Sequence, residues 1–177
     1  MASASADKKA VAETVYRYAT GVDRRDWALY RSLFADTVSV DFSGFDPHLE
    51  PRVVSADDWV AGIVPLFTGL AATQHTMTNP RAVVDGDEAT ITMDVQAHHV
   101  HDLDDPASWY TVGGHYENTL VRIDGRWLLT GVRLTVNWSA GDPAVMELAR
   151  RTGKRLLSSG GQGAGTAGLD DPEPPGH

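Results

Sequence analysis

Apolar positions recur with helical spacing in the first seventy residues of the chain. One stripe runs over about residues 7–21, and a second helix is predicted over residues 26–35, because Asp26 suits an N-cap. A third helix is predicted over residues 56–70, where Ser55 opens a pattern that resembles a capping box. The apolar stripes of these helices comprise Val11, Val15, Tyr18, Val22, Trp27, Tyr30, Leu33, Phe34, Trp59, Ile63 and Phe67.

From residue 73 onward the hydrophobic period changes to two, which is typical of strands. Asp85-Gly86-Asp87 and Asp124-Gly125 separate neighbouring segments in the way that hairpin turns do. Residues 43–54, which contain one glycine and two prolines, are interpreted as a loop. The predicted strands are residues 37–42, 73–84, 89–101, 110–123 and 127–138.

Three helices followed by four long strands predict an α+β domain, with the helices packed on one face of a curved antiparallel sheet. A closing helix is expected over residues 143–157. Residues 158–177 are rich in Gly, Pro, Ser and Asp, so this tail is expected to be disordered, as are residues 1–7. One folded domain over residues 8–157, without internal repeats, follows from this organisation.

Composition narrows the classes of function. The 177 residues suffice for one domain, and 15 Lys+Arg against 24 Asp+Glu give a net charge of −9, which argues against nucleic acid and anionic membrane surfaces as partners. The chain has no cysteine, so disulfides, thiolate nucleophiles and cysteine-bound metals are excluded. Neither a signal peptide nor a membrane-spanning run is recognisable, so a cytoplasmic protein is expected.

Acid–base chemistry therefore falls to His, Asp, Glu and Tyr, and two residues stand out. Asp23 ends the first predicted helix, where the helix macrodipole disfavours a carboxylate, so a partner for it is expected. His75 begins the first long strand after an apolar helix. The alternatives are a surface aspartate that caps the next helix and a histidine whose bonds are satisfied within the core.

One face of the strand predicted over residues 89–101 is apolar except at its end, where His99 lies. An apolar face that ends in a single histidine is typical of a ligand pocket with one polar group. The alternative is a core face whose last residue reaches solvent. The residues that share this face by alternation are Ile91, Met93, Val95, Ala97 and His99.

Three histidines close together, His98, His99 and His101, suggest a metal site. In a strand only residues two apart point the same way, so only His99 and His101 can converge, and no third ligand is evident. We therefore expect no metal. The chain also lacks a phosphate loop, a dinucleotide fingerprint and a Gly-x-Ser-x-Gly elbow, so no cofactor is expected.

Several short motifs follow one another in a set order over about residues 8–155. They are Tyr18, Asp23-Arg24-Arg25-Asp26-Trp27, Val40-Asp41-Phe42, Gln74-His75, Ile123-Asp124-Gly125-Arg126-Trp127 and Asn137-Trp138. Each motif is weak by itself, but together they resemble the SnoaL-like group of the nuclear-transport-factor-like superfamily. Within that group the resemblance is strongest to the scytalone dehydratase branch, and next to the lindane dehydrochlorinase branch.

The resemblance implies a cone-shaped barrel whose C-terminal helix lies over a pocket, in a homodimer or homotrimer. In these proteins an aspartate at the position of Asp23 orients a histidine at the position of His75, which is the proton-transfer base, and a second pocket histidine falls on His99. Two tyrosines that hold a water on the substrate carbonyl are replaced here, so a more apolar or aromatic small-molecule substrate is expected. The pocket lining implied by the resemblance is Tyr18, Val22, Phe42, Val95, Ala97, Tyr116 and Trp138, with Val22 and Phe42 in place of those tyrosines.

The implied function is cofactor-free dehydration of a polycyclic or aromatic polyketide-type intermediate. In this hypothesis His75 removes a proton α to a carbonyl, and His99, together with Tyr116, protonates the departing hydroxyl. Cyclisation and double-bond isomerisation begin with the same deprotonation and stay open, as does a non-catalytic small-molecule-binding domain. Epoxide hydrolysis is disfavoured because Asp94 lies on the opposite face of its strand from His99.

Overall fold

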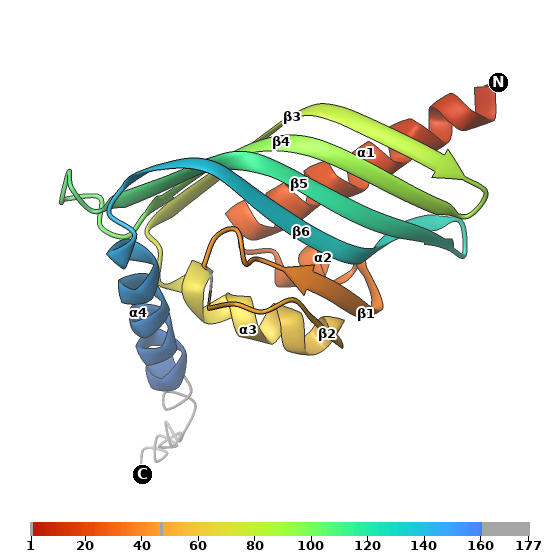
Figure 1. Ribbon diagram of the computed structural model, residues 1–177. Helices are drawn as coiled ribbons and strands as arrows, with labels where there is room; N and C mark the ends of the chain where they lie inside the picture. The colour runs from red at the N-terminus through yellow and green to blue at the C-terminus, as the bar shows by residue number, and fades with distance from the viewer. Residues whose placement is uncertain (1, 47, 161–177) are drawn as a thin grey trace, which may run out of the picture.

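The computed structural model describes residues 2–46 and 48–160, which form a six-stranded sheet and four helices (Figure 1). The disorder expected for residues 161–177 lies outside the described residues. The helices are α1 (Ala2–Asp23), α2 (Trp27–Arg31), α3 (Ala56–Thr68) and α4 (Ala144–Gly160). The strands are β1 (Phe34–Asp41), β2 (Arg52–Ser55), β3 (Ala72–Asp85), β4 (Glu88–Val100), β5 (Trp109–Ile123) and β6 (Arg126–Gly141).

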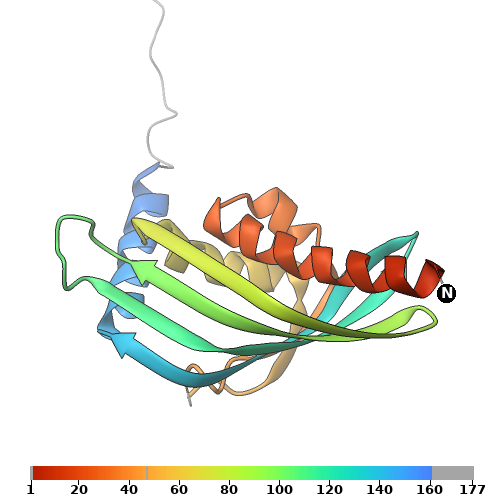
Figure 2. The ribbon, with the colours of Figure 1, turned by 90° about the horizontal axis from the view of Figure 1, so that it is seen from above.

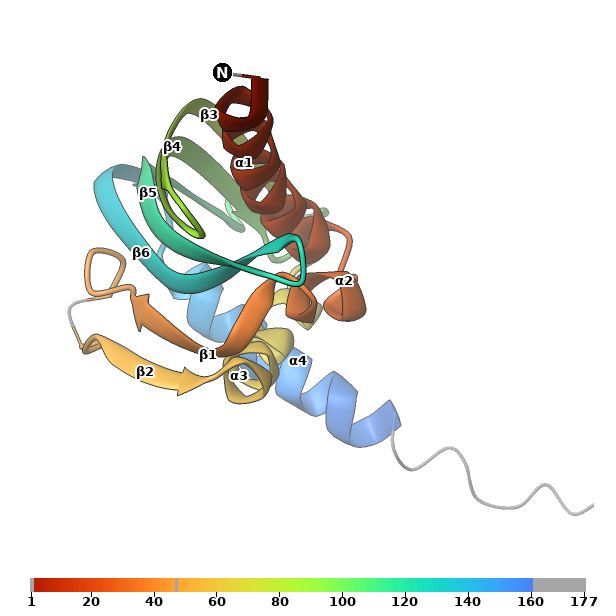
Figure 3. The same cartoon turned by 90° about the vertical axis from the view of Figure 1, so that its right-hand side faces the viewer.

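The α+β architecture predicted from the sequence is confirmed. The strands lie in the order β2-β1-β6-β5-β4-β3, and each neighbouring pair is antiparallel except β1 and β6, which run parallel. The sheet is therefore mixed rather than purely antiparallel, because β1 comes from the helical half of the chain and enters beside the last strand. The sheet curves strongly, and α1, α2 and α3 lie on the side toward which it curves (Figures 2 and 3).

Two short elements differ from the sequence prediction. Residues 52–55, expected to be loop, form β2, a four-residue edge strand that pairs with β1 alone and leaves Val53 71% exposed, so no buried alternation marks it in the sequence. Helix α2 ends at Arg31 rather than near residue 35, because Phe34 already pairs with Leu129 of β6. Sheet pairing here overrides a helical pattern.

The hydrophobic core lies between α1, α3 and the concave face of the sheet. The predicted stripe of α1 and the predicted apolar face of β4 are both buried there, as the periodicities required. The predicted helix caps are also confirmed. The Asp26 carboxylate accepts from the Leu29 N–H at 2.9 Å, and the Ser55 hydroxyl accepts from the Asp58 N–H at 3.0 Å.

Helix α1 begins at Ala2, earlier than the start predicted near Asp7, so residues 2–7 are helical where disorder was expected. The cause lies in tertiary structure. Arg122 of β5 binds the Asp7 carboxylate at 2.8 Å, and Val11, one turn further on, is fully buried. These contacts hold the first turns of a segment whose alanines also favour helix.

Helix α4 packs closely on α3 at the end of the sheet where β4 ends and β5 begins (Figure 1). Glycine makes this approach possible, because a Cβ on Gly69 would lie 1.8 Å from the Ala149 carbonyl oxygen and a Cβ on Gly153 would lie 1.7 Å from that of Pro65. Thr152 of α4 also contacts the ring of His101, with Nε2 and Oγ1 3.3 Å apart. The C-terminal helix is thus tied both to α3 and to the end of β4.

The closing helix also extends further than the sequence prediction. Residues 158–160, expected to belong to the disordered tail, continue α4. The hydroxyls of Ser158 and Ser159 donate to the Arg155 carbonyl oxygen, each at 2.9 Å. The serines that favoured a loop interpretation therefore bond within the preceding helical turn.

We predict that Gly153→Ala destabilises the protein by about 1–3 kcal/mol, because the new methyl group must push α4 away from the Pro65 carbonyl. The matched control is Gly62→Ala in α3, where a Cβ meets nothing within 4 Å. That control should be neutral or stabilising by about 0.5–1 kcal/mol, because alanine favours helix. Urea unfolding of both variants measures the difference, and equal stabilities would contradict this account of the α3–α4 contact.

Candidate active site

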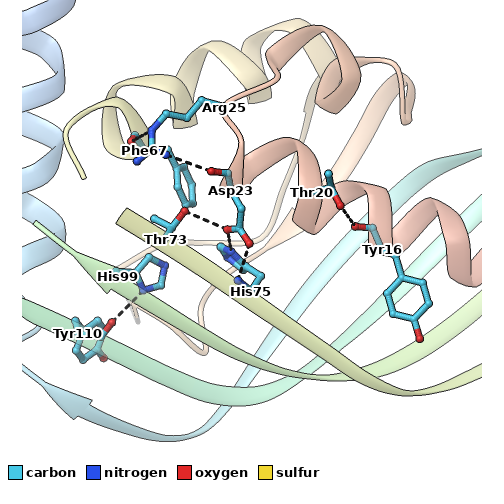
Figure 4. Close-up of polar contacts among 9 residues, drawn as sticks. All are labelled: Tyr16, Thr20, Asp23, Arg25, Phe67, Thr73, His75, His99 and Tyr110. Carbon is cyan, nitrogen blue, oxygen red and sulfur yellow. Dashed lines mark hydrogen bonds and ion pairs between the residues drawn. The ribbon is translucent and has the colours of Figure 1, made fainter. Parts of the chain in front are cut away.

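The last residue of α1 and the outermost strand of the sheet meet through one carboxylate. β3 is an edge strand, so its outward N–H groups need partners from elsewhere. Asp23 supplies one: its Oδ2 accepts the His75 backbone N–H at 2.8 Å, while its Oδ1 lies 2.7 Å from Nδ1 of the His75 ring (Figure 4). The partner expected for Asp23 is therefore His75, held by both its backbone and its ring.

Thr73, two residues before His75 on β3, completes the environment of the carboxylate. Its hydroxyl donates to Asp23 Oδ1 at 3.1 Å (Figure 4). Burial works against ionisation of Asp23, but the hydrogen bonds from the His75 ring, the His75 N–H and Thr73 outweigh it, so the pKa of Asp23 is lowered. Asp23 is accordingly an anion at neutral pH.

The carboxylate decides which nitrogen of His75 carries the proton. An ionised carboxylate only accepts hydrogen bonds, so Nδ1 must be the protonated nitrogen and Nε2 keeps its lone pair. Because the two nitrogens lie on opposite sides of the ring, Nε2 points away from Asp23. The His75 side chain is 5% exposed and that of Asp23 is 20% exposed, so the pair is shielded from bulk water. This arrangement is that of a general base with an orienting carboxylate.

Arg25 fixes the end of α1 that carries Asp23. Its guanidinium donates to the carbonyl oxygens of Phe67 at 2.9 Å and of Asp23 at 3.2 Å (Figure 4). It also donates to the carbonyl oxygen of Leu70 at 2.6 Å. Its backbone adopts the left-handed region, with φ of 53°, which turns the chain sharply after the helix. Sequence reasoning missed both Arg25 and Thr73, although alternation along β3 places Thr73 on the face of His75.

The interior side of the His75 ring meets His99 and Phe67. The ring centroids of His75 and His99 are 5.7 Å apart and nearly perpendicular, and Phe67 of α3 lies 6.1 Å from His75. His99 is 3% exposed, and its Nδ1 lies 3.2 Å from the Tyr110 carbonyl oxygen. Since a carbonyl only accepts, Nδ1 of His99 donates and Nε2 is left as an acceptor.

His99 does not have the protonation state expected for a general acid. Burial, followed by the proximity of His75, lowers the pKa of His99 from 6.5 to about 4. At neutral pH the ring is therefore neutral, which does not favour proton donation from it. The expectation that His99, together with Tyr116, protonates the departing hydroxyl stays a prediction. His99 can instead accept a hydrogen bond on the inner face of the sheet.

We predict that the buried neutral state of His99 makes the protein sensitive to acid. The pKa of His99 is lower in the folded protein than in the unfolded chain. Between pH 6.5 and about pH 4 the unfolded chain therefore binds a proton at His99 that the folded protein does not bind. The free energy of unfolding consequently decreases as the pH is lowered through this range. The penalty at pH 5 relative to pH 7 is roughly 2 kcal/mol. His99→Gln should lose less stability between these pH values than the native protein in urea titrations. Equal losses in the two proteins would contradict the assignment.

Five residues of the expected pocket lining share the concave side of the molecule and are buried there: Tyr18, Val22, Val95, Ala97 and Tyr116. Phe42 is partly buried and stacks on Trp59 of α3 with ring centroids 5.2 Å apart. Ala97 pairs directly with His75 across β3 and β4, so only a methyl group lies beside the base on that strand.

Trp138 lies on the other face of the sheet, so its expected place in the pocket is wrong. Its ring covers Gly113, whose neighbour across the sheet is the exposed Gln96, and it is 48% exposed. The cause is an irregularity in β6: Gly113 pairs with Trp138, but Gly114 pairs with Val136, which leaves Asn137 as an extra residue. One extra residue reverses the face of every side chain that follows.

The three clustered histidines diverge. His98 lies on the outer face with its ring 5.6 Å from that of Trp109, His99 points inward, and His101 contacts Thr152. Within residues 2–46 and 48–160 no group of three His, Asp or Glu side chains is placed to hold a metal ion. Asp94, as predicted, lies on the outer face, where its Oδ2 accepts from Asn79 at 2.6 Å.

A surface groove of about 360 Å³ reaches the pair from the outside, between α1 and β3. Asp23 and His75 form one end of it, and Tyr16 and Thr20 of α1 lie along it (Figure 4).

In the described part of the chain no helix is both long and apolar enough to cross a membrane.

Comparisons with known proteins agree with this architecture. The model of the SnoaL-like domain family matches residues 3–133. A curated relative, a dehydratase from Aspergillus candidus, is 28% identical over 150 residues, which cover 78% of this chain and 87% of the relative. The resemblance to this family inferred from the motifs is confirmed.

Solved structures show the same fold. A crystal structure of a protein from Kribbella flavida is 30% identical, covers 83% of this chain and 99% of its own, and superposes with a TM-score of 0.74. A candidate scytalone dehydratase from Novosphingobium aromaticivorans is 19% identical, covers 80% and 92% of the two chains, and has a TM-score of 0.69. A hexachlorocyclohexane dehydrochlorinase from Novosphingobium barchaimii is 19% identical, with coverage of 78% and 91% and a TM-score of 0.62.

Proposed function

We propose that this chain, which belongs to the SnoaL-like domain family, is a cofactor-independent acid–base enzyme that dehydrates an aromatic or polycyclic intermediate. The observation that carries the proposal is the contact of Asp23 with His75, at 2.7 Å to the ring and 2.8 Å to the backbone. A buried polar pair is costly to maintain without hydrogen bonds, and this pair satisfies one ring nitrogen while leaving the other as a base.

The proposed reaction needs a single imidazole. Nε2 of His75 takes the proton from the carbon α to a substrate carbonyl, and the electrons of the broken C–H bond form the enolate. Asp23 stabilises the resulting imidazolium. The same Nε2–H then protonates the hydroxyl on the β carbon as the C–O bond breaks, so that water leaves and the enzyme returns to its starting state. Because one group performs both transfers, the hydrogen and the hydroxyl leave from the same face.

The neutral state of His99 supports the assignment of both proton transfers to His75. With a pKa of about 4 it is not an acid at neutral pH, so His75 is left to return the proton. Nε2 of His99 is an acceptor and suits a hydroxyl group of the substrate, either the leaving hydroxyl or a phenolic one. His99 is thus assigned to substrate orientation rather than to proton transfer.

The aromatic side chains of the core, of which Phe67 contacts the His75 ring, support a planar substrate. Trp59 and Phe67 come from α3, and Phe42 directly follows β1. The rings of all three lie within 7 Å of other aromatic rings. Aromatic rings favour stacked and edge-to-face neighbours. The curated relative from Aspergillus candidus is a dehydratase, which supports the reaction class.

The test is incubation of the purified protein in deuterated water with a panel of aromatic and polycyclic β-hydroxy ketones, followed by mass spectrometry. The proposal expects loss of one water from at least one compound, and deuterium uptake at the α carbon when elimination is slow. Ring closure or double-bond migration with deuterium uptake would point to the other outcomes of the same deprotonation. Tight binding without either change would favour a small-molecule-binding domain.

A further inference from the structure

The chain turns between α1 and α2 at Arg25, a residue with an uncommon backbone conformation. Its φ of 53° lies in the left-handed region, which residues with long side chains seldom adopt. Glycine or asparagine would adopt this conformation at lower cost. Such a conformation persists where the surrounding contacts determine it. The contacts of the half-buried side chain must therefore account for an arginine at this position.

The guanidinium of Arg25 binds three backbone oxygens. Nε donates to the Phe67 carbonyl oxygen at 2.9 Å, and a second nitrogen donates to that of Asp23 at 3.2 Å (Figure 4). The third nitrogen donates to the Leu70 carbonyl oxygen at 2.6 Å. Because the guanidinium is planar and its donors have fixed directions, three simultaneous bonds determine where the side chain lies. Arg25 therefore joins the last turn of α1 to the end of α3.

These hydrogen bonds complete the end of α3. The last carbonyl groups of a helix have no partner within it, and many helices satisfy them through a glycine in the left-handed conformation. The capping residue of α3 is Gly69, but its backbone is right-handed, with φ of −84°, and the last turn of α3 contains no basic residue. Arg25 supplies both donors and a positive charge, which the helix macrodipole favours at this end.

The end of α3 is also fixed in the core. Phe67 and Leu70 are 9% and 3% exposed. The backbone at Gly69 contacts α4, since a Cβ there would lie 1.8 Å from the Ala149 carbonyl oxygen. The centroid of the Phe67 ring lies 6.1 Å from that of the His75 ring. Arg25 thus holds the end of α1 against a packed part of the molecule that itself contacts the His75 ring.

Asp23 must be placed accurately to hold His75. Its two oxygens lie 2.8 Å from the backbone nitrogen and 2.7 Å from Nδ1 of His75, so it contacts the backbone and the ring together. Asp23 is the last residue of α1, and helix ends fray. The hydrogen bond from Arg25 to the Asp23 carbonyl oxygen acts on this last residue itself. A displacement of about 1 Å in such a site can cost about 100-fold in rate.

We propose that Arg25 is a positioning residue for the proposed reaction. By holding the last turn of α1 against the end of α3, it sets the Asp23 carboxylate so that His75 carries its proton on Nδ1 and keeps Nε2 free. The effect on turnover rests on the proposed function. The tautomer of His75 is a property of the resting protein, so it can be measured without any substrate.

Arg25→Gly removes the guanidinium and suits a φ of 53°. In ¹⁵N NMR of protein labelled at histidine, the native His75 ring should carry its proton on Nδ1 alone, whereas in Arg25→Gly the tautomer with the proton on Nε2 should become populated. On a converted substrate, kcat should fall by about 10- to 100-fold, because the base is misplaced. Free guanidinium at low millimolar concentration should restore part of the native signal, because it can occupy the place of the lost side chain.

The matched control is Arg150→Ala. Arg150 also donates to a backbone oxygen of α3, that of Gly62 at 3.1 Å, but it does so from α4. The control should keep the native tautomer of His75 and the native kcat. Near-ultraviolet circular dichroism checks folding, and Arg25→Asn replaces Arg25→Gly if the latter is not folded, because asparagine also tolerates the left-handed region. An unchanged His75 tautomer in the folded variant, or the same change in Arg150→Ala, overturns the inference.

The two readouts separate this inference from the proposed function. If the tautomer of His75 depends on Arg25 but no substrate is turned over, the positioning role stands and the proposed function fails. If turnover depends on His75 while Arg25→Gly changes neither the tautomer nor kcat, the proposed function stands and the positioning role fails.

Discussion

Replacing His75 by alanine is expected to lower kcat/KM by about 10²–10⁴-fold, the usual contribution of a general base. The loss should fall on kcat rather than on KM, because the ring acts on the α proton and contributes little to holding the substrate. In the single-imidazole mechanism both proton transfers disappear together. The measurement is initial rates on whichever hydroxy ketone the native protein converts.

The matched control for this substitution is His98→Ala. His98 is the neighbour of His99 on β4, but it lies on the outer face beside Trp109. It should leave kcat/KM within a factor of about three, as a surface change distant from the chemistry does. Full turnover in His75→Ala, or an equal loss in both variants, would remove the role assigned to His75.

Asp23→Asn should lower kcat/KM by a similar factor, but for a different reason. The His75 backbone N–H at the Oδ2 position can only donate, so the oxygen of the introduced amide must take that place and its NH₂ group must face Nδ1. Nδ1 then becomes the acceptor, and the proton moves to Nε2. A base in the wrong tautomer cannot abstract a proton, and the comparable exchange in the serine-protease triad lowers kcat by about 10⁴-fold.

The same substitution should also alter stability in a pH-dependent way. The pKa of Asp23 is lower in the folded protein than in the unfolded chain, so the ionised carboxylate stabilises the folded state. This stabilisation is fully present above the unfolded aspartate pKa of about 3.9, and it is lost as the pH falls through the lower pKa of the folded protein. Asp23→Asn should therefore cost about 1–3 kcal/mol at neutral pH. The difference from the native protein should shrink below about pH 4.

Asp94→Asn is the matched control for this second substitution. Asp94 is an aspartate on the outer face that accepts from Asn79 at the surface. Its replacement should change stability by less than about 0.5 kcal/mol and leave turnover intact. A stability loss in Asp23→Asn that persists unchanged at low pH would contradict the charge-based account.

The contact between Asp23 and His75 could be predicted from the sequence, because a carboxylate is unfavourable at the C-terminal end of a helix. A carboxylate at the end of a helix opposes the macrodipole, which signals a partner, and the resemblance named that partner as His75. Periodicity alone also placed the buried face of β4 correctly, because two-residue alternation is strict in a regular strand.

Trp138 shows where alternation fails. No pattern in the sequence predicts the extra residue at Asn137. The irregularity depends on how β6 pairs with β5, and the paired residues lie more than twenty positions apart in the chain. The parallel pairing of β1 with β6 was missed for the same reason: Phe34 and Leu129 lie far apart in sequence. Long-range register is a tertiary property.

The protonation state of His99 was also beyond sequence reasoning. Its place on an apolar face was correctly predicted, but its role depends on how completely the surroundings exclude water and on the distance to His75. The aromatic cluster has the same character. Tyr18 and Tyr30 were recognised as apolar positions of two helices, and only the structure shows that their rings pack together and that Tyr116 joins them.

The nitrogen chemical shifts of the His75 ring test the central claim most directly. ¹⁵N NMR of protein labelled at histidine distinguishes a protonated ring nitrogen from one with a free lone pair, and His75→Gln identifies the signals. We predict that at neutral pH Nδ1 carries the proton and Nε2 does not, and that Asp23→Asn exchanges the two. A protonated Nε2 in the native protein, or rapid averaging of both tautomers, would contradict the account.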